Sequence, residues 1–131
     1  MSHIVEAKTS IQNPNGALLR QAVQVVAQQH DGGRVVDHYL TYAGKRVASR
    51  LAIFTDVIHR GIGIIVKETG ELTFIGDPFM YETQAEAVQQ QIIQTYVSLA
   101  TMQALQQMGY QTTAEDGEEG QMCLTGVSQY A

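Results

Sequence analysis

The chain has no tryptophan, one cysteine and two prolines among its 131 residues. Because Cys123 stands alone, no disulfide can form within the chain, and a reducing compartment is expected. Long apolar runs are also absent, since the longest, residues 62–66, is far too short to cross a membrane. The first residues lack the basic start and apolar block of a secretory signal. We therefore expect a cytoplasmic protein with neither a membrane span nor a disulfide framework.

Lysine and arginine are missing from residues 68–131, which we call the second half of the chain. All eight lie between Lys8 and Lys67, whereas nine of the 13 acidic residues come after Lys67. The first half therefore carries a formal charge of +4 and the second half −9, within a net charge of −5. This asymmetry favours an interaction surface, either for an anionic ligand or between the halves of neighbouring copies. The alternative is that folding interleaves the two halves, so that the field largely cancels.

The clearest structural pattern is residues 61–79, GIGIIVKETGELTFIGDPF. It predicts a β-hairpin that pairs residues 62–67 with 71–75 across the turn ETGE, where Gly70 can adopt a positive φ. Glycine inside a strand marks a bulge or a close neighbour. For Gly61 and Gly63 we expect that neighbour to be a helix, with Gly63 letting a long helix pack close to the hairpin.

Two helices are expected. The first follows NPNG, where Asn13 or Asn15 can act as the N-cap, and it stops at HDGG, where Gly32 or Gly33 can become left-handed. The second begins at TQAE, a capping-box pattern with Thr83 as the cap, and it runs to residue 108.

The second half of the long helix loses the regular apolar pattern of the first half. Met102, Leu105 and Met108 spread around the helix, so more than one side needs a cover. These three residues predict an adaptable interface between copies of the chain. The alternative is that the closing strands cover the extra side within one subunit.

Further strands are expected at residues 3–11, 35–42, 51–57, 110–113 and 122–127. The resulting order, β-α-β-β-β-β-α-β-β, predicts an α+β fold, a two-layer sandwich with a mostly antiparallel sheet and two helices. No repeat or linker divides the chain, so residues 1–131 form one expected domain. The expected core contains Ile64, Val66, Phe74, Ile92, Tyr96 and Leu99.

Catalytic and metal-binding patterns are weak. GIG at 61–63 lacks the third glycine of a dinucleotide fingerprint. Asp37 and His38 are neighbours in a strand and should point to opposite faces, whereas Asp56 and His59 could form an oriented base. The four histidines match no metal-ligand spacing with the cysteine: they are His3, His30, His38 and His59. No metal and no cofactor is expected.

One basic group with interleaved tyrosines is a candidate ligand site. Guanidinium forks and aromatic faces can together hold a phosphate and stack a base. The alternative is a solvated loop face without a ligand. The group consists of Arg34, Tyr39, Tyr42, Lys45, Arg46, Arg50 and Arg60.

Several short stretches are shared with one family of small proteins. They are MSH at the start, Lys8-Thr9, GIGI at 61–64, LTFIGD at 72–77, QTYV at 94–97 and GY at 109–110. On these stretches the chain resembles, over nearly its whole length, the family of hypothetical chloroplast reading frame thirty-five, found in cyanobacteria, algal plastids, other bacteria and phages. Two departures stand out: Gly61 replaces the family's acidic residue, and Phe79 and Tyr81 stand where tryptophans are usual.

The resemblance implies little chemistry. The family has no established activity, and its frequent gene neighbourhood with AAA-type ATPases implies an adaptor or substrate-recognition role. The cytoplasm expected from the single cysteine would be the host cytoplasm for a viral protein and the stroma for a plastid protein. If the family's acidic residue or tryptophans serve a function, the resemblance implies that this chain has lost or changed that function.

The sequence thus predicts a non-enzymatic binding or adaptor protein that forms a homo-oligomer and engages a larger partner, with an AAA-type ATPase as one candidate. The alternative is an oligomeric, phage-encoded protein that sequesters a small phosphorylated or nucleotide ligand. An enzyme ranks third, because no persuasive nucleophile, metal set or acid–base pair is present. The acidic total and the lack of an RNA-binding aromatic motif argue against nucleic acid.

Overall fold

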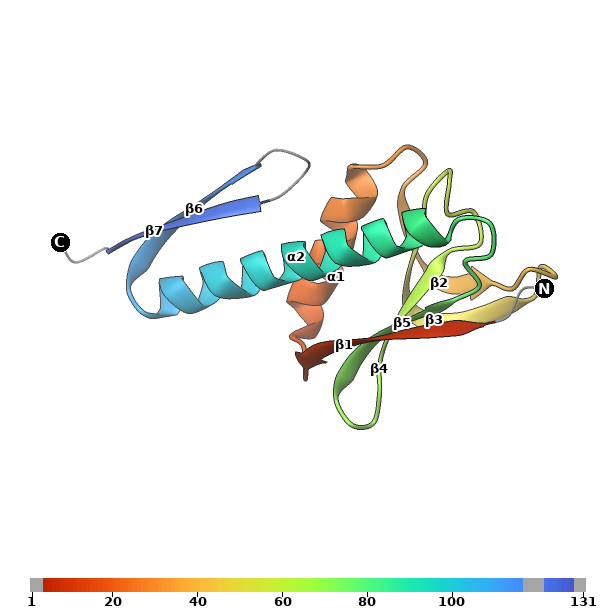
Figure 1. Cartoon of the computed structure of the whole chain (residues 1–131). Helices are drawn as coiled ribbons and strands as arrows, with labels where there is room; N and C mark the ends of the chain where they lie inside the picture. Colours follow the sequence, from red (N-terminus) through yellow and green to blue (C-terminus); the bar gives the residue numbers. More distant parts are fainter. Residues whose placement is uncertain (1–3, 117–121, 129–131) are drawn as a thin grey trace.

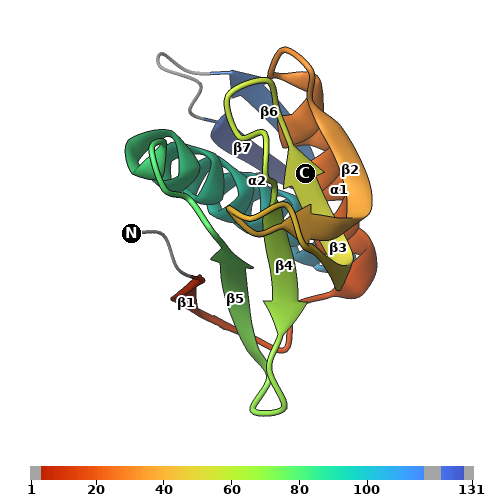
Figure 2. The same ribbon diagram turned by 90° about the vertical axis from the view of Figure 1, so that its right-hand side faces the viewer.

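A computed structural model of the chain describes residues 4–116 and 122–128, with side chains up to residue 109. A five-stranded antiparallel sheet has the order β1-β5-β4-β3-β2, and both helices pack on one of its faces (Figures 1 and 2). The predicted α+β class, the two helices and the order of elements are confirmed. The elements are β1 (Val5–Gln12), α1 (Gly16–Gln28), β2 (Arg34–Leu40), β3 (Arg46–Phe54), β4 (Ile62–Val66), β5 (Glu71–Gly76), α2 (Glu82–Gln107), β6 (Tyr110–Asp116) and β7 (Met122–Ser128).

The predicted hairpin is the centre of the sheet. β4 pairs with β5, with Ile64 opposite Phe74, and the turn closes through Gly70, whose φ is +88°. β1 completes the sheet by pairing with β5 on its other side. His3, the expected first residue of that strand, lies outside the described residues.

The main core lies between the sheet and the helices. Ile64, Phe74, Ile92 and Tyr96 are buried there, as predicted, and Leu99 packs against them while partly exposed. The prediction for Val66 is wrong, because its side chain is 50% exposed. Val66 is the last residue of β4, next to the exposed turn, and it borders a cleft instead of the core.

The second face of the sheet is covered by the end of the β2–β3 hairpin. The Leu40 N–H donates to the carbonyl of Arg60 at 2.6 Å, so the end of β2 reaches the start of β4. As a result, Tyr39 is buried beside Gly63 of β4, and Ile75 of β5 lies close to the same glycine. The expected reason for Gly63 is therefore wrong: its close neighbour is Tyr39 on this outer face and not the long helix. Gly61, with φ +80°, lies in the same way against the ring of Phe54.

The helix termini follow local hydrogen bonds. Asn15 is the N-cap of α1, and its Oδ1 accepts from the N–H groups of Ala17 and Leu18. Gly32, with φ +66°, turns the chain after α1. The prediction of a capping box with Thr83 as the N-cap is wrong, because α2 begins at Glu82 with Tyr81 as its N-cap. A tight turn immediately before the helix fixes Tyr81, so the helix starts two residues early.

The end of α2 extends beyond the sheet, and the β6–β7 hairpin lies beside it (Figure 1). We call residues 101–109, β6 and β7 together the C-terminal arm. The expected closing pair of strands is confirmed, with β6 and β7 slightly longer than predicted. Among the described residues, no helix combines the length and apolar character that a membrane span requires.

Candidate functional site

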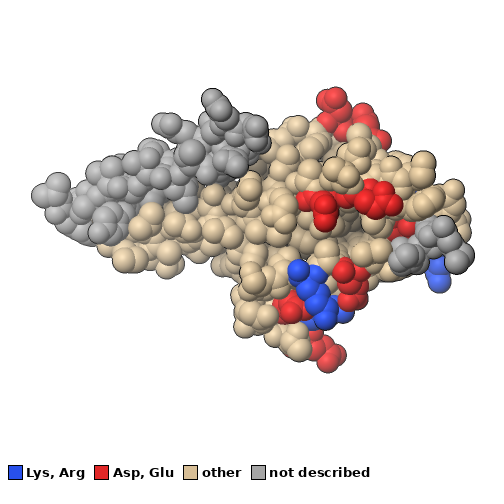
Figure 3. Space-filling model, viewed as in Figure 1, with Lys and Arg blue, Asp and Glu red and all other residues tan. Residues whose placement is uncertain are grey.

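The seven residues of the predicted basic group do not form one surface. Tyr39 is buried on the outer face of the sheet, and Arg34 stacks over the Phe54 ring, 4.8 Å from its centroid. Lys45 is exposed in the β2–β3 turn. Figure 3 shows basic side chains at separate places on one face, one group directly beside acidic side chains. The remaining four residues belong to three different environments, described next.

Arg46 belongs to an exposed cluster with Asp37 and His38. His38 Nδ1 lies 3.2 Å from Asp37 Oδ1 and 3.1 Å from Arg46 Nη2. The expectation that Asp37 and His38 point apart is wrong, because their side chains are in contact. They lie beside a bulge in the β2–β3 ladder, where Val36 pairs with Ala52 but His38 already pairs with Ala48. The hydrogen bond from His38 is the main reason that the pKa of Asp37 is lowered. Such an open cluster contributes little to stability.

Arg60 has the opposite character, since only 7% of it is exposed. Its Nε donates to the carbonyl of Asp77 at 2.9 Å, and its Nη2 donates to the carbonyl of Phe79. Its guanidinium lies 4.7 Å from the centroid of the Tyr81 ring and 5.3 Å from that of Tyr42. The guanidinium of Arg60 is therefore already bound by other groups of the protein, and it fixes the segment between β5 and α2.

Asp77 and Tyr81 complete this buried network. The Asp77 Oδ2 accepts from the N–H of Tyr42, which ties the β2–β3 turn to the end of β5. The Tyr81 hydroxyl accepts from the Arg60 N–H and donates to the carbonyl of Asp77. Burial raises the pKa of Tyr81, although the charge of Arg60 opposes the shift. Within the described residues, the buried Asp77 Oδ1 has no hydrogen-bond partner.

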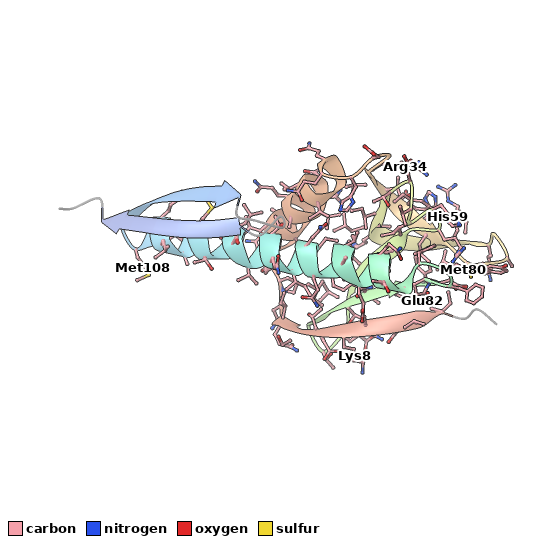
Figure 4. The ribbon with its side chains drawn as sticks, turned by 45° about the horizontal axis from the view of Figure 1, so that its top comes forward. Lys8, Arg34, His59, Met80, Glu82 and Met108 are labelled. Carbon is pink, nitrogen blue, oxygen red and sulfur yellow. The ribbon has the colours of Figure 1, made fainter. Side chains whose placement is uncertain are left out.

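The network holds a turn with an unusual residue at its third position. The Tyr81 N–H donates to the carbonyl of Pro78 at 2.9 Å, and Met80 has a φ of +79°. A positive φ at this position after Phe79, whose φ is not positive, is typical of a type II turn, which normally requires glycine or asparagine there. Met80 is 76% exposed, so its side chain is presented to solvent at the end of the molecule opposite to Met108 (Figure 4).

Two aromatic rings lie beside this turn. The Tyr42 ring is 58% exposed, and it meets the Phe79 ring edge to face with centroids 5.4 Å apart. We call Tyr42, Phe79 and Met80 the Met80 surface. Met80 could not be predicted from the sequence, because a type II turn is predicted from glycine or asparagine and PFMY contains neither.

Arg50 borders a cleft of about 670 Å³ between the start of α1 and strands β3 and β4. The same cleft contains a second arginine, Arg20 of α1, which the predicted group did not include. We call it the α1 cleft. Its described lining is Gly16, Leu19, Arg20, Ala48, Ser49, Arg50, Leu51, Ile64, Ile65 and Val66.

The histidines of the described chain have structural partners. His30 Nε2 lies 2.6 Å from Gln91 Oε1, which joins the end of α1 to α2. His59 contacts the carbonyl of Val57 and the guanidinium of Arg60, so the possible pair with Asp56 is replaced by other contacts. Among the described residues, no three His, Cys, Asp or Glu side chains gather in a way that could hold a metal ion.

The residues expected at an interface lie on the C-terminal arm. Met102 and Leu105 are partly buried, whereas Met108 is 70% exposed. The β6–β7 backbone lies along this part of α2, as the single-subunit alternative requires. The same helix also carries Val97, which is 48% exposed. The arm is thus partly covered within one chain and still presents the side chain of Met108.

Comparison of the chain with protein-family models, curated proteins and solved structures finds no match. The resemblance to the family of hypothetical chloroplast reading frame thirty-five therefore stays a prediction from short stretches. Function has to be argued from the geometry of this chain alone.

Proposed function

We propose that this chain is a non-enzymatic cytoplasmic binding protein that docks a larger protein through the Met80 surface. The observation that carries the proposal is the combination, at Met80, of a φ of +79° with 76% exposure of the residue. A positive φ costs a side-chain-bearing residue of order 1–3 kcal/mol, and such strain clusters at functional positions. Here the strain serves to present a side chain to solvent.

The surrounding network supports the proposal because several independent contacts hold the backbone of the turn in place. Arg60 binds the carbonyls of Asp77 and Phe79, one on each side of Pro78. The next residue along, Tyr81, is buried and begins α2. The Met80 surface is therefore rigid in its backbone, which lowers the conformational entropy lost on binding.

The composition of the Met80 surface indicates the kind of partner. An exposed methionine has a flexible apolar side chain that can adapt to a partner surface, and both methionine and aromatic residues are enriched at protein interfaces. The fitting partner is a protein with an apolar pocket. The family resemblance would make an AAA-type ATPase one such partner.

Photo-crosslinking tests this proposal. A photo-reactive residue at position 80 should give a discrete adduct in lysate of the source cells, whereas the same residue at Gln21, an exposed position on α1, should not. Excess unlabelled parent protein should suppress the adduct, but unlabelled Met80→Asp should not, because aspartate tolerates the positive φ and removes the apolar side chain. Equal adducts from both positions, or equal competition by Met80→Asp, would contradict the proposal.

Self-association through the C-terminal arm is a second candidate function. It is supported by Met108, which is 70% exposed at the end of α2, far from the Met80 surface (Figure 4). The two surfaces lie at opposite ends of the molecule, so an oligomer formed through the arm would leave the Met80 surface accessible.

A further inference from the structure

We propose that the α1 cleft binds an organic anion that carries a short aliphatic chain, of the alkyl phosphate or fatty acid class. This site is separate from the Met80 surface and independent of it. Its volume of about 670 Å³ lies within the usual range for small-ligand sites.

Two arginines give the cleft its charge. Arg20 lies one turn after Gly16 on α1, and Arg50 comes from β3, where three residues, Ser49 to Leu51, oppose the single residue Asp37 of β2. Among the described residues, none forms an ion pair or hydrogen bond with the side chain of Arg20 or Arg50, unlike those of Arg46 and Arg60. Both guanidinium groups are thus available to an anion, and each can bind a carboxylate or phosphate through two parallel hydrogen bonds.

The acidic second half of the chain does not neutralise this site. The described lining of the α1 cleft contains no aspartate or glutamate. The sequence of α1 itself is free of acidic residues, and so are the neighbouring positions 7–15. An anion in the α1 cleft would therefore meet two cations and no like charge among its lining residues, although the whole chain is negative.

The walls determine the rest of the ligand. Leu19, Leu51 and Ile64 are buried side chains that form the inner wall, and Val66 is 50% exposed at the edge. A ligand with an aliphatic chain would cover Val66, and burial of apolar area is favourable by about 25 cal/mol per Å². The described lining contains no aromatic ring on which a nucleobase could stack, so an aliphatic chain fits better than a nucleotide.

Gly16 offers a way to close the α1 cleft without changing its charge. A Cβ added at Gly16 would meet no atom within 4 Å, and its φ is not in the left-handed region. Gly16→Phe should therefore fold normally and place its ring in open space at the cleft. This variant separates occupation of the cleft from loss of positive charge.

Titration calorimetry of the full chain tests the proposal with four probes: octyl phosphate, octanoate, inorganic phosphate and the neutral octyl glucoside. We expect octyl phosphate, octanoate or both to bind, and the stronger of the two identifies the head group. Inorganic phosphate should bind at least ten-fold more weakly, and octyl glucoside should not bind. Binding of neither octyl anion would overturn the proposal, as would equal binding of octyl glucoside. Equal binding of inorganic phosphate would overturn its aliphatic part.

Variants locate the site. Arg20→Gln and Arg50→Gln should each weaken binding about ten-fold or more, the loss of one charge-assisted hydrogen bond. Arg46→Gln is the matched control, because it removes the same charge from β3 outside the α1 cleft, and it should bind like the parent. Gly16→Phe should abolish binding while its unfolding midpoint stays unchanged. Parent-like binding by the Arg20, Arg50 and Gly16 variants would show that the ligand lies elsewhere and overturn the proposal.

Discussion

The ring of Tyr39 lies against the backbone of Gly63, although β2 and β4 are separated in the sheet by β3. A Cβ on Gly63 would be 2.8 Å from Tyr39 Cδ1 and 2.9 Å from Ile75 Cγ2. Gly63 therefore allows the end of the β2–β3 hairpin to close over the outer face. This contact gives that face a small core of its own.

Gly63→Val should destabilise the fold by about 1–3 kcal/mol, because the valine would overpack against Tyr39 and Ile75. Urea unfolding measures the change. In a Tyr39→Leu background the cost should shrink, since the smaller side chain leaves room, whereas an Ile92→Val background should leave it unchanged. If the Ile92→Val background reduced the cost of Gly63→Val instead, the close neighbour of Gly63 would be the long helix and not Tyr39.

Arg60→Met should destabilise the protein by about 2–3 kcal/mol, because it leaves the carbonyls of Asp77 and Phe79 without their charged donor. Arg46→Met is the control, since Arg46 is exposed and should change stability by less than about 0.5 kcal/mol. Chemical unfolding of both variants measures the difference. Equal effects would mean that burial of Arg60 contributes no stability.

Met80→Gly should stabilise the fold by about 1 kcal/mol, because glycine adopts the positive φ without a Cβ clash. Met80→Ala should give no such gain, since alanine keeps the Cβ. Thermal unfolding under identical conditions compares the two with the parent. An unlabelled Met80→Gly protein that is more stable than the parent but no longer competes for the adduct would show that the strain at Met80 serves binding and not folding.

Alkaline pH should weaken the fold through two buried phenols. Burial raises the pKa of Tyr81, and burial together with the charge of Glu6 raises the pKa of Tyr39. Because the folded-state pKa exceeds the unfolded value of about 10, the neutral phenols stabilise the fold fully below that pH. Their contribution is lost as pH rises through the folded-state pKa.

The urea midpoint as a function of pH tests this expectation. Tyr39→Phe and Tyr81→Phe should flatten the alkaline decline, whereas Tyr42→Phe, which removes an exposed hydroxyl, should not. A decline of equal steepness in all three variants would place its cause in other groups.

Self-association should appear in light scattering at low salt and decrease at high salt, because opposed charges of the two chain halves steer the copies together. Met102→Glu combined with Leu105→Glu should abolish it if the C-terminal arm is the interface. Gln90→Glu with Gln94→Glu, at exposed positions on the first half of α2, is the charge-matched control. A monomer at high micromolar concentration in low salt would exclude self-association as a function of the C-terminal arm.

The sequence predicted the fold well where periodicity is the dominant signal. The hairpin at β4–β5, both helices and the core positions of Ile64, Phe74 and Ile92 follow from apolar spacing and turn residues. The Gly63 neighbour could not be predicted, because it depends on how far the β2–β3 hairpin bends over the sheet. A single sequence records no such long-range contact.

The candidate sites were harder to predict for a related reason. The basic group was assembled from residues near one another in the sequence, but β-strands separate such residues: Arg60 turned inward and Arg50 joined Arg20, thirty positions earlier. Burial also changes what an arginine can bind, since the buried Arg60 donates to backbone carbonyls of its own chain and not to a ligand. Only the three-dimensional arrangement distinguishes an available guanidinium from one that is already bound.

The bend of the β2–β3 hairpin over the sheet constrains the order in which the chain can fold. Tyr39 has no surface to pack against until β4 and β5 have paired, and the Tyr42 N–H finds Asp77 only after β5 has ended in its turn. The central hairpin has local contacts and can form early, whereas the closure joins residues 35 positions apart. The outer face should therefore be the last part to close during folding and the first to open in the native state.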